Sequence, residues 1–326
     1  MREMPHIPDE KIDSADTDGT AEKETSLKAS ALAQPQHMEL LVSSMSAHGI
    51  AVTVGRKVVS CLREGGWDVS VRVTTPDEDP EEVAAASQAP LLGALGGDGY
   101  LSAVACGVHR SGALFVPFPG GRGNDLCRAL GIGTDAVARA RSLLKGFTEQ
   151  ELDGIRITDP HGNSRIVLGI VSFGFDALAN RIANDTSWLR RGSLTYAYGA
   201  LSALRTHRPT PLLATVDGVE EDLGGWLTSV SNSGWFGGGI NLVPSSRIGD
   251  GQIELVHIGP LPMRQAIRVL AQVLVTRGEN PAMTVRSVRE ITVHTPEGVI
   301  AMADGDYVGE TPLTMTAEPH VARVLV

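Results

Sequence analysis

The first part of the chain alternates short apolar runs with segments whose apolar residues recur at helical spacing. The runs are typical of buried strands and the spaced segments of helices. Strands are expected at Met38–Val42, Trp67–Val73, Pro90–Leu95 and Ala113–Val116, and helices at Ile50–Arg63, Pro80–Ser87, Leu101–Val108 and in the stretch ending at Leu130. This alternation with short links predicts a parallel sheet covered by helices on both faces, where ligands bind beyond the carboxyl ends of the strands.

The pattern changes after about Lys145, where strands dominate. They are expected at Glu151–Thr158, Arg165–Ser172, Pro211–Val216, Gly225–Ser231, Gly251–Ile258 and Val285–His294, with helices at Ala177–Asp185, Leu194–Arg205 and Pro262–Thr276. Turn signals such as Asp153-Gly154 and Asp217-Gly218 link the strands, which is typical of an antiparallel sandwich. The predicted fold class is therefore α/β plus all-β: an N-terminal doubly wound parallel-sheet domain followed by a C-terminal antiparallel β-sandwich.

Composition adds a tail and excludes some functions. Residues 1–36 hold eight acids and four bases, without aromatic residues or apolar periodicity, so we expect a disordered acidic segment. A net charge of −10 argues against nucleic-acid binding. Neither a secretory signal nor a bilayer-spanning apolar run is expected. Cys61, Cys106 and Cys127 lie far apart, and we expect buried free thiols in a reducing cytosol.

Two glycine-rich turns follow strands of the predicted parallel sheet. Gly96-Gly97-Asp98-Gly99-Tyr100 precedes one helix, and the turn from Pro119 to Asp125, with glycines at 120, 121 and 123, opens another. Glycine lets backbone N–H groups approach a phosphate, and the helix N-terminus adds partial positive charge. Asp98 would repel phosphate unless it acts through a metal, a water or a hydroxyl that it orients. The turns therefore predict phosphate chemistry rather than simple phosphate binding.

Further motifs follow in order along the chain: Gly174-Phe175-Asp176-Ala177, Asn232 with Phe236–Ile240 and Pro244, Asp250-Gly251, and Asp304-Gly305-Asp306. With the two turns they resemble the GGDGT, PxGTxND, GFDA, FGGGM, metal-associated Asp-Gly and Asp-Gly-Glu motifs of the diacylglycerol kinase catalytic family. These are soluble lipid kinases related to sphingosine kinases and, more distantly, to NAD kinases. The resemblance runs from about Met38 to the end of the chain and carries the same two-domain fold.

The resemblance implies transfer of the γ-phosphate of ATP to a lipid hydroxyl, with Mg²⁺ as cofactor and diacylglycerol as the expected substrate, giving phosphatidic acid. A sphingoid or other lipid kinase, and a catalytically degenerate relative that binds lipid or nucleotide, remain alternatives. The predicted domains are a tail at 1–36, an ATP-binding domain at 37–145, a lipid-substrate sandwich at 146–310 and a C-terminal return to the first domain at 311–326.

Site residues carry over by position in the motifs. Asp306 is the expected general base, with Asp304 and Asp98 as further catalytic candidates. The residues expected to bind nucleotide are Ser46, Thr75, Gly96, Gly97, Asp98, Gly99, Tyr100, Gly121, Arg122, Asn124 and Asp125. The expected Mg²⁺ ligands are the Asp250 carboxylate and the main-chain oxygens of Arg247 and Gln252, although Asp250-Gly251 is also an ordinary hairpin turn.

Several positions depart from the family pattern. The first phosphate-binding loop, Asn-Pro-x-Ser-Gly in the family, reads Ser43-Ser44-Met45-Ser46-Ala47 here. Tyr100 and Arg122 replace threonines, and Asp306 replaces a longer glutamate. Arg122 can compensate by pairing with phosphate, whereas Tyr100 either stacks on adenine or narrows the pocket. These departures are the argument for a degenerate relative.

A basic stretch interrupts the acidic chain. It holds Arg181, Trp188, Arg190, Arg191, Arg205, His207 and Arg208, with Asp185 as its only acid. Tryptophan among arginines suits the headgroup layer of a membrane, although a solvated helix face is the simpler alternative. We expect a cytoplasmic protein, peripheral at the inner face of the membrane, whose partner is a lipid substrate there. A homodimer is left open.

Overall fold

The computed structural model describes residues 36–186, 198–199, 202–203, 211–276, 280–295 and 298–326. All contacts discussed below lie within the unit formed by residues 35–326. The acidic tail, the expected helix Leu194–Arg205 and the basic stretch beyond Thr186 lie outside the described residues, except for isolated positions. Arg181 is the one cation of that stretch within the described residues, and it is exposed.

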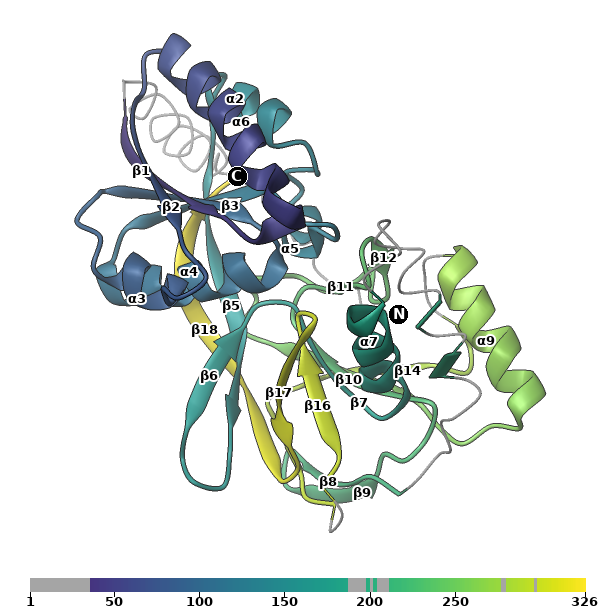
Figure 1. Ribbon diagram of the computed structural model, residues 1–326. Helices are drawn as coiled ribbons and strands as arrows, with labels where there is room; N and C mark the ends of the chain where they lie inside the picture. Colours follow the sequence, from purple (N-terminus) through teal and green to yellow (C-terminus); the bar gives the residue numbers. More distant parts are fainter. Residues whose placement is uncertain (1–35, 187–197, 200–201, 204–210, 277–279, 296–297) are drawn as a thin grey trace, which may run out of the picture. The chain divides into compact units, whose positions relative to one another are not determined.

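Four parallel strands form one part of a ten-stranded sheet, in the order β2-β1-β3-β4. They are β1 (His37–Ser43), β2 (Asp68–Thr74), β3 (Leu91–Gly96) and β4 (Leu114–Pro119). The helices are α2 (Ile50–Glu64), α3 (Pro80–Ala85), α4 (Asp98–Ser111), α5 (Asp125–Ala129) and α6 (Ala136–Leu143), and η1 (Ser46–Gly49) is a single 3₁₀ turn. Helices α2 and α6 pack together, as do α3 and α4 (Figure 1). The predicted α/β architecture is confirmed.

The long strand β18 (Leu313–Leu325) joins the parallel strands to the antiparallel part of the same sheet. Val324 pairs with Phe115 of β4 in parallel, while other residues of β18 pair with antiparallel neighbours. The antiparallel strands are β5 (Glu149–Thr158), β6 (Ser164–Val167), β8 (Leu213–Val216), β9 (Val219–Asp222) and β15 (Glu290–Val293). The end of the chain therefore lies beside a strand of the first 120 residues.

A second, six-stranded antiparallel sheet has the order β14-β13-β10-β7-β16-β17. Its strands are β7 (Ile170–Phe173), β10 (Leu227–Ser231), β13 (Ile253–Ile258), β14 (Thr284–Val288), β16 (Ile300–Ala303) and β17 (Asp306–Glu310). Phe173 and Leu255 share a buried apolar cluster with Met315 of the large sheet. The opposite face packs against α7 (Phe175–Asp185) and α9 (Met263–Thr276) (Figure 1). The predicted antiparallel sandwich is confirmed.

Two segments expected as single strands each divide between the two sheets. Arg165–Ser172 forms β6 and β7, because the backbone N–H groups of Leu168, Gly169 and Ile170 donate to the Asp304 carboxylate. Val285–His294 lies in β14 and β15, and Asp217 accepts from the N–H groups at the junction, Arg289 and Glu290. In both cases a carboxylate from elsewhere in the chain binds the backbone where the strand changes sheet.

The thiols follow the expectation in part. Cys106 and Cys127 are buried and free, and burial raises the pKa of the Cys106 thiol to about 12. Cys61 is free but only half-buried, contrary to expectation, since its position in α2 lies beside the exposed face of the helix.

Candidate functional site

A cavity of about 690 Å³ opens at the carboxyl ends of the parallel strands. From the first half of the chain it is lined by residues 43–47, 74–76, 78, 80, 97–100, 103, 121–123, 125 and 126. From the second half it is lined by Arg165, Gly169, Ile170, residues 235–238 and residues 304–306. Segments far apart in the sequence therefore share one pocket at the edge of the sheet where ligands of parallel sheets bind.

The two glycine-rich turns touch each other within this pocket. Gly120 N donates to Gly96 O at 2.8 Å, and a Cβ built on Gly121 would lie 2.5 Å from the Cα of Gly97. No side chain fits at that contact, so glycine is required there. Ser46 Oγ accepts from Gly97 N at 3.1 Å and joins the first loop to the second. The three predicted phosphate loops thus form one continuous surface.

Most of the residues predicted to bind nucleotide line the pocket: Ser46, Thr75, Gly97, Asp98, Gly99, Tyr100, Gly121, Arg122 and Asp125. Asn124 is buried behind the lining: its Oδ1 accepts from Gly121 N at 2.8 Å and its Nδ2 donates to Gly121 O at 3.1 Å, so its contact with nucleotide stays a prediction. It holds the second turn in shape. Gly96 also lies outside the lining, beneath the Tyr100 ring.

The Tyr100 ring forms a side wall of the pocket. A Cβ on Gly96 would lie 2.3 Å from Tyr100 Cδ1, so the ring lies directly against the turn. Its hydroxyl is 3.1 Å from Thr74 Oγ1 at the end of β2, and burial raises the pKa of Tyr100 to about 12. The ring therefore narrows the pocket, and stacking of Tyr100 on adenine stays a prediction.

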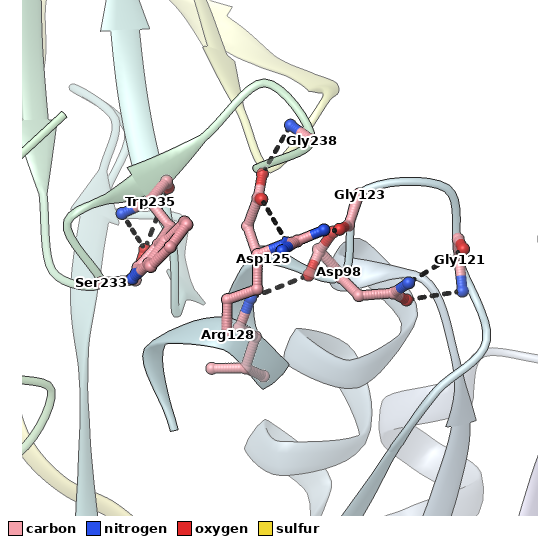
Figure 2. A network of polar contacts seen from close by, with 10 residues as sticks. Asp98, Gly121, Gly123, Asp125, Arg128, Ser233, Trp235 and Gly238 are labelled. Atoms are coloured by element: carbon pink, nitrogen blue, oxygen red, sulfur yellow. Dashed lines mark hydrogen bonds and ion pairs between the residues drawn. The ribbon is translucent and has the colours of Figure 1, made fainter. Parts of the chain in front are cut away.

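The carboxylates of Asp98 and Asp125 converge at the second turn (Figure 2). Asp98 Oδ1 accepts from Leu126 N at 3.0 Å, yet burial and the nearby Asp125 raise the pKa of Asp98 to about 7. Burial also raises the pKa of Asp125, whose Oδ2 accepts from Gly238 N at 2.9 Å. A Cβ on Gly123 would lie 3.0 Å from Asp98 Oδ2 and 3.5 Å from Asp125 Oδ2. Two acids with too few donors thus face one small space.

Arg128 connects α5 to β11 (Trp235–Phe236), which pairs with β12 (Ile240–Asn241). Its guanidinium lies 5.8 Å from the centre of the Trp235 ring, a cation–π contact, and 4.0 Å from Asp125 Oδ1 (Figure 2). Asp125 Oδ1 is nevertheless buried without a hydrogen bond among the described residues. The arginine therefore only partly offsets the charge of Asp125.

Asp304 differs from these acids because its carboxylate accepts more hydrogen bonds from the fold. It accepts from Ser102 Oγ at 2.8 Å, from Leu168 N and Gly169 N at 3.3 Å, and from Ile170 N at 3.0 Å. Burial raises the pKa of Asp304 in spite of these bonds. These bonds indicate an anchoring role, while a catalytic role for Asp304 stays a prediction, since Asp304 also lines the pocket and its Oδ1 accepts a single hydrogen bond.

Asp306 lies two residues further on, at the start of β17, and its side chain projects to the pocket. A Cβ on Gly99 would lie 2.8 Å from Asp306 Oδ2, so the carboxylate lies over the first turn of α4. Burial and the neighbouring Asp304 raise the pKa of Asp306, while Arg165 opposes the shift. No hydrogen bond to this carboxylate is present in the described part of the chain, so it is free to meet a substrate.

The predicted metal ligands Arg247, Asp250 and Gln252 do not line the pocket. Asp250 Oδ1 accepts from Gln252 N at 3.0 Å, and Arg247 O accepts from Gly249 N at 3.0 Å. The described residues include no group of three His, Cys, Asp or Glu side chains arranged to hold a metal ion. The loop has the contacts of a hairpin turn, and a metal there stays a prediction.

Arg165 and Trp235 are among the pocket residues that the sequence missed. Arg165 lies on the exposed strand β6 outside every motif, so no local signal marks it. Trp235 directly precedes the Phe236–Ile240 motif, and an aromatic residue beside a glycine turn could have indicated a pocket residue. Both come from the second half of the chain and face loops of the first.

Comparison with known proteins agrees with this geometry. Residues 37–156 match the diacylglycerol kinase catalytic domain, and residues 169–326 match the YegS C-terminal NAD kinase beta sandwich-like domain. The chain is 28% identical over 292 residues to a protein named diacylglycerol kinase from Mycobacterium tuberculosis (strain CDC 1551 / Oshkosh), covering 87% of this chain and 93% of that protein.

A Pseudomonas aeruginosa protein named "Probable lipid kinase YegS-like" is 29% identical over 277 residues, covering 82% of this chain and 88% of the relative. A crystal structure described as a diacylglycerol kinase from Bacillus anthracis str. Sterne shares the fold, with a TM-score of 0.65, 17% identity, and coverage of 89% of this chain and 96% of that one. No helix in the described residues has the length and apolar character to cross a membrane. Two family models thus match successive parts of the chain, the diacylglycerol kinase catalytic domain and the YegS C-terminal domain, and the chain is similar to lipid kinases along most of its length.

Proposed function

We propose that the chain is an ATP-dependent diacylglycerol kinase that makes phosphatidic acid. The observation that carries the proposal is the half-buried Asp98 carboxylate, with a pKa of about 7, held between two glycine turns that share one pocket. Phosphoryl transfer needs a cradle for the phosphates, positive charge beside them and a group that orients the attacking hydroxyl. The name of the Mycobacterium tuberculosis relative supports diacylglycerol as the acceptor.

The phosphate cradle is proposed to be the three loops around Gly97 and Gly121. The first N–H groups of α4 have no partner within the helix, and the helix N-terminus favours anions. Arg122 and Arg165 both line the pocket and are exposed, without an ion pair among the described residues. They would pair with phosphate oxygens in the place of the missing threonine hydroxyls.

Mg²⁺ is proposed to bind at Asp98 and Asp125. The fit rests on two half-buried carboxylates of raised pKa, whose Oδ2 atoms both lie beside Gly123. Asp125 Oδ1, 4.0 Å from Arg128, lacks a hydrogen bond among the described residues. A hard divalent cation prefers such oxygens, and when bound it would offset charge on the phosphate oxygens. The residues themselves hold the space open, because Gly123 has no side chain to fill it.

Asp306 is proposed as the general base. Its carboxylate lies over the start of α4, beside the phosphate cradle, and faces the pocket without a hydrogen bond among the described residues. A base of raised pKa can accept the proton of the lipid hydroxyl as that oxygen attacks phosphorus. Asp304, two residues earlier, would keep the loop that carries Asp306 in place.

The test is transfer of label from γ-labelled ATP to lipid. Purified full-length protein is incubated with Mg²⁺ and mixed micelles containing dioleoylglycerol, sphingosine or monoacylglycerol, with Asp98→Asn as the matched variant. Labelled phosphatidic acid from the wild type alone is the expected result. Label in sphingosine or monoacylglycerol alone would show that the acceptor is not diacylglycerol. No labelled lipid, in an assay where a control kinase is active, would overturn the proposal.

A further inference from the structure

Helix α9 exposes an apolar stripe on the outer side of the six-stranded sheet. Met263 is 38% exposed and Ile267 is 45% exposed, one helical turn apart, and Ala271 continues the row in the exposed class. Large apolar side chains at consecutive turn positions on one exposed face cost free energy when water surrounds them. The stripe therefore indicates a surface that meets an apolar partner.

The opposite side of α9 already belongs to the core. Ala266 and Val273 are buried in the cluster that contains Phe175, Trp226 and Phe236. Trp226 Nε1 also donates to Leu261 O at 2.9 Å and fixes the chain just before the helix. The exposed stripe is therefore not a core face left open, since the core of this region is filled without it.

Arginines flank the stripe in a chain that is otherwise acidic. Arg264 and Arg268 directly follow Met263 and Ile267, both are exposed, and neither has an ion pair within the described part of the chain. The segment Met263–Thr276 contains no acid, against a net charge of −10 for the whole chain. Arg181 on α7, which covers the same sheet, is exposed too. This surface therefore combines apolar side chains with unpaired cations.

We propose that the outer face of α9 docks in the headgroup layer of an anionic lipid bilayer, with Met263 and Ile267 inserted and Arg264 and Arg268 at the headgroups. Apolar insertion together with cations is the combination that binds helices to anionic membranes. The proposal rests on the proposed function, because a kinase of a membrane lipid has to reach that lipid. The docking proposal extends the proposed function by naming the helix that docks and the charge of the lipid.

A second copy of the chain is the less suitable occupant of this face. From position 263 to 271 the stripe runs roughly 12 Å along the helix, whereas a stable protein interface buries about 800 Å² on each partner. A symmetric pairing of α9 with itself would also bring Arg264 and Arg268 close to the same residues of the other copy. Anionic lipid has the opposite charge and needs no large complementary surface.

The experiment is vesicle co-sedimentation of the full-length protein without ATP. Vesicles are phosphatidylcholine alone or phosphatidylcholine with about one-third phosphatidylglycerol. The test variants are Met263→Ser/Ile267→Ser and Arg264→Gln/Arg268→Gln. The matched controls are Val71→Ser/Val73→Ser on the exposed edge strand β2 and Arg56→Gln/Lys57→Gln on the exposed face of α2.

We expect binding to anionic vesicles only, weakened about tenfold or more by each α9 pair and unchanged by the control pairs. Phosphorylation of a water-soluble short-chain diacylglycerol should stay at the wild-type rate in the α9 variants, which separates docking from catalysis. Equal binding to neutral vesicles, no binding at all, or wild-type binding by both α9 variants would overturn the proposal. A dimer that Met263→Ser/Ile267→Ser dissociates would assign the face to a second copy instead.

Discussion

Two half-buried carboxylate sites lie close together in this molecule and are built in opposite ways. Asp304 accepts four hydrogen bonds, from Ser102 and from three consecutive backbone N–H groups. Asp98 and Asp125 face each other with fewer donors, and one oxygen of Asp125 has none among the described residues. A saturated carboxylate serves the fold, whereas an under-satisfied pair stores unfavourable charge that a ligand can relieve.

The difference between the two sites predicts that substitutions will affect stability and activity in different ways. Changes at the saturated site should lower stability, and changes at the under-satisfied pair should lower activity while raising stability. This opposition is the expected trade-off at catalytic sites, where charges are held in positions that the fold alone disfavours.

The largest effect is expected from Asp98→Asn. It should lower lipid phosphorylation by about a thousandfold or more, because the carboxylate beside the phosphates is lost. The variant should also be more stable than the wild type at pH 8, by an amount on the order of 2–4 kcal/mol, because ionised Asp98 is unfavourable when buried. Activity and thermal unfolding are measured on the same preparations.

The raised pKa of Asp98 also predicts how the stability difference between Asp98→Asn and the wild type changes with pH. The folded pKa of Asp98, about 7, lies above the ordinary value of 3.8, so its stabilising contribution is present below pH 4 and is lost as the pH rises through 7. The advantage of Asp98→Asn should therefore shrink as the pH falls from 8 to 5. A variant less stable than the wild type at pH 8 would contradict the account of this site.

Asp304→Asn should lower stability, in contrast to Asp98→Asn. The amide nitrogen of the new asparagine would face hydrogen-bond donors and leave backbone N–H groups unpaired, so the free energy of unfolding should fall by about 3 kcal/mol. Ser102→Ala removes one of the four donors and should cost about 1 kcal/mol. Chemical denaturation measures both. If Asp304→Asn kept wild-type stability, the anchoring role would be wrong.

Asp306→Asn should lower kcat about a hundredfold because the base is lost. Stability should change little, because this carboxylate has no hydrogen bond among the described residues. The pKa of Asp306 is raised, so activity should increase with pH as this group loses its proton, and the variant should lack that acidic limb. Glu310→Gln, at the other end of β17, is the control and should behave as the wild type. A hundredfold loss in that control would point to damage of the hairpin.

Arg165→Gln should weaken the kinetic efficiency with ATP by about tenfold, since a charged hydrogen bond to phosphate contributes about 1.5–3 kcal/mol. Arg110→Gln is the matched control, because Arg110 is an exposed arginine of α4 paired with Glu82 outside the pocket. Steady-state kinetics at several ATP concentrations distinguish the two variants. Equal kinetics for both would remove Arg165 from the site.

Tyr100→Phe should have the smallest effect. It removes the hydrogen bond between the phenol and Thr74 and keeps the ring that forms the pocket wall. The free energy of unfolding should fall by about 1 kcal/mol, and the KM for ATP should change by no more than a few-fold. Thermal unfolding and ATP titration measure the two quantities. A large loss of ATP affinity would mean that the hydroxyl itself contacts the nucleotide.

The sequence predicted what local patterns determine. Glycine turns after β3 and β4 predicted two loops at one pocket, since strand ends of one parallel sheet meet at one edge. It could not show that Asn124 braces Gly121 or that Tyr100 lies on Gly96, because those contacts depend on side-chain placement. Motif position alone suggested a binding role for Asn124, and the structure adds a bracing role for its buried amide.

Long-range contacts explain the other differences. Asp304 binds the backbone at Ile170 across 134 positions of sequence, so neither its saturation nor the division of the expected strand Arg165–Ser172 was visible locally. Arg165 reaches the pocket only because β6 pairs with β5 beside β18. A side chain placed by sheet pairing carries no signal in its own neighbourhood.

A crystal structure with a non-hydrolysable ATP analogue and Mg²⁺ tests the central claim most directly. The account predicts a triphosphate lying between Gly97–Gly99 and Gly121–Gly123, with a metal ion within coordination distance of Asp98 and Asp125 and the Tyr100 ring in place beside it. A nucleotide bound elsewhere on the chain would contradict this account. So would crystals of active protein whose pocket stays empty at a saturating concentration of the analogue.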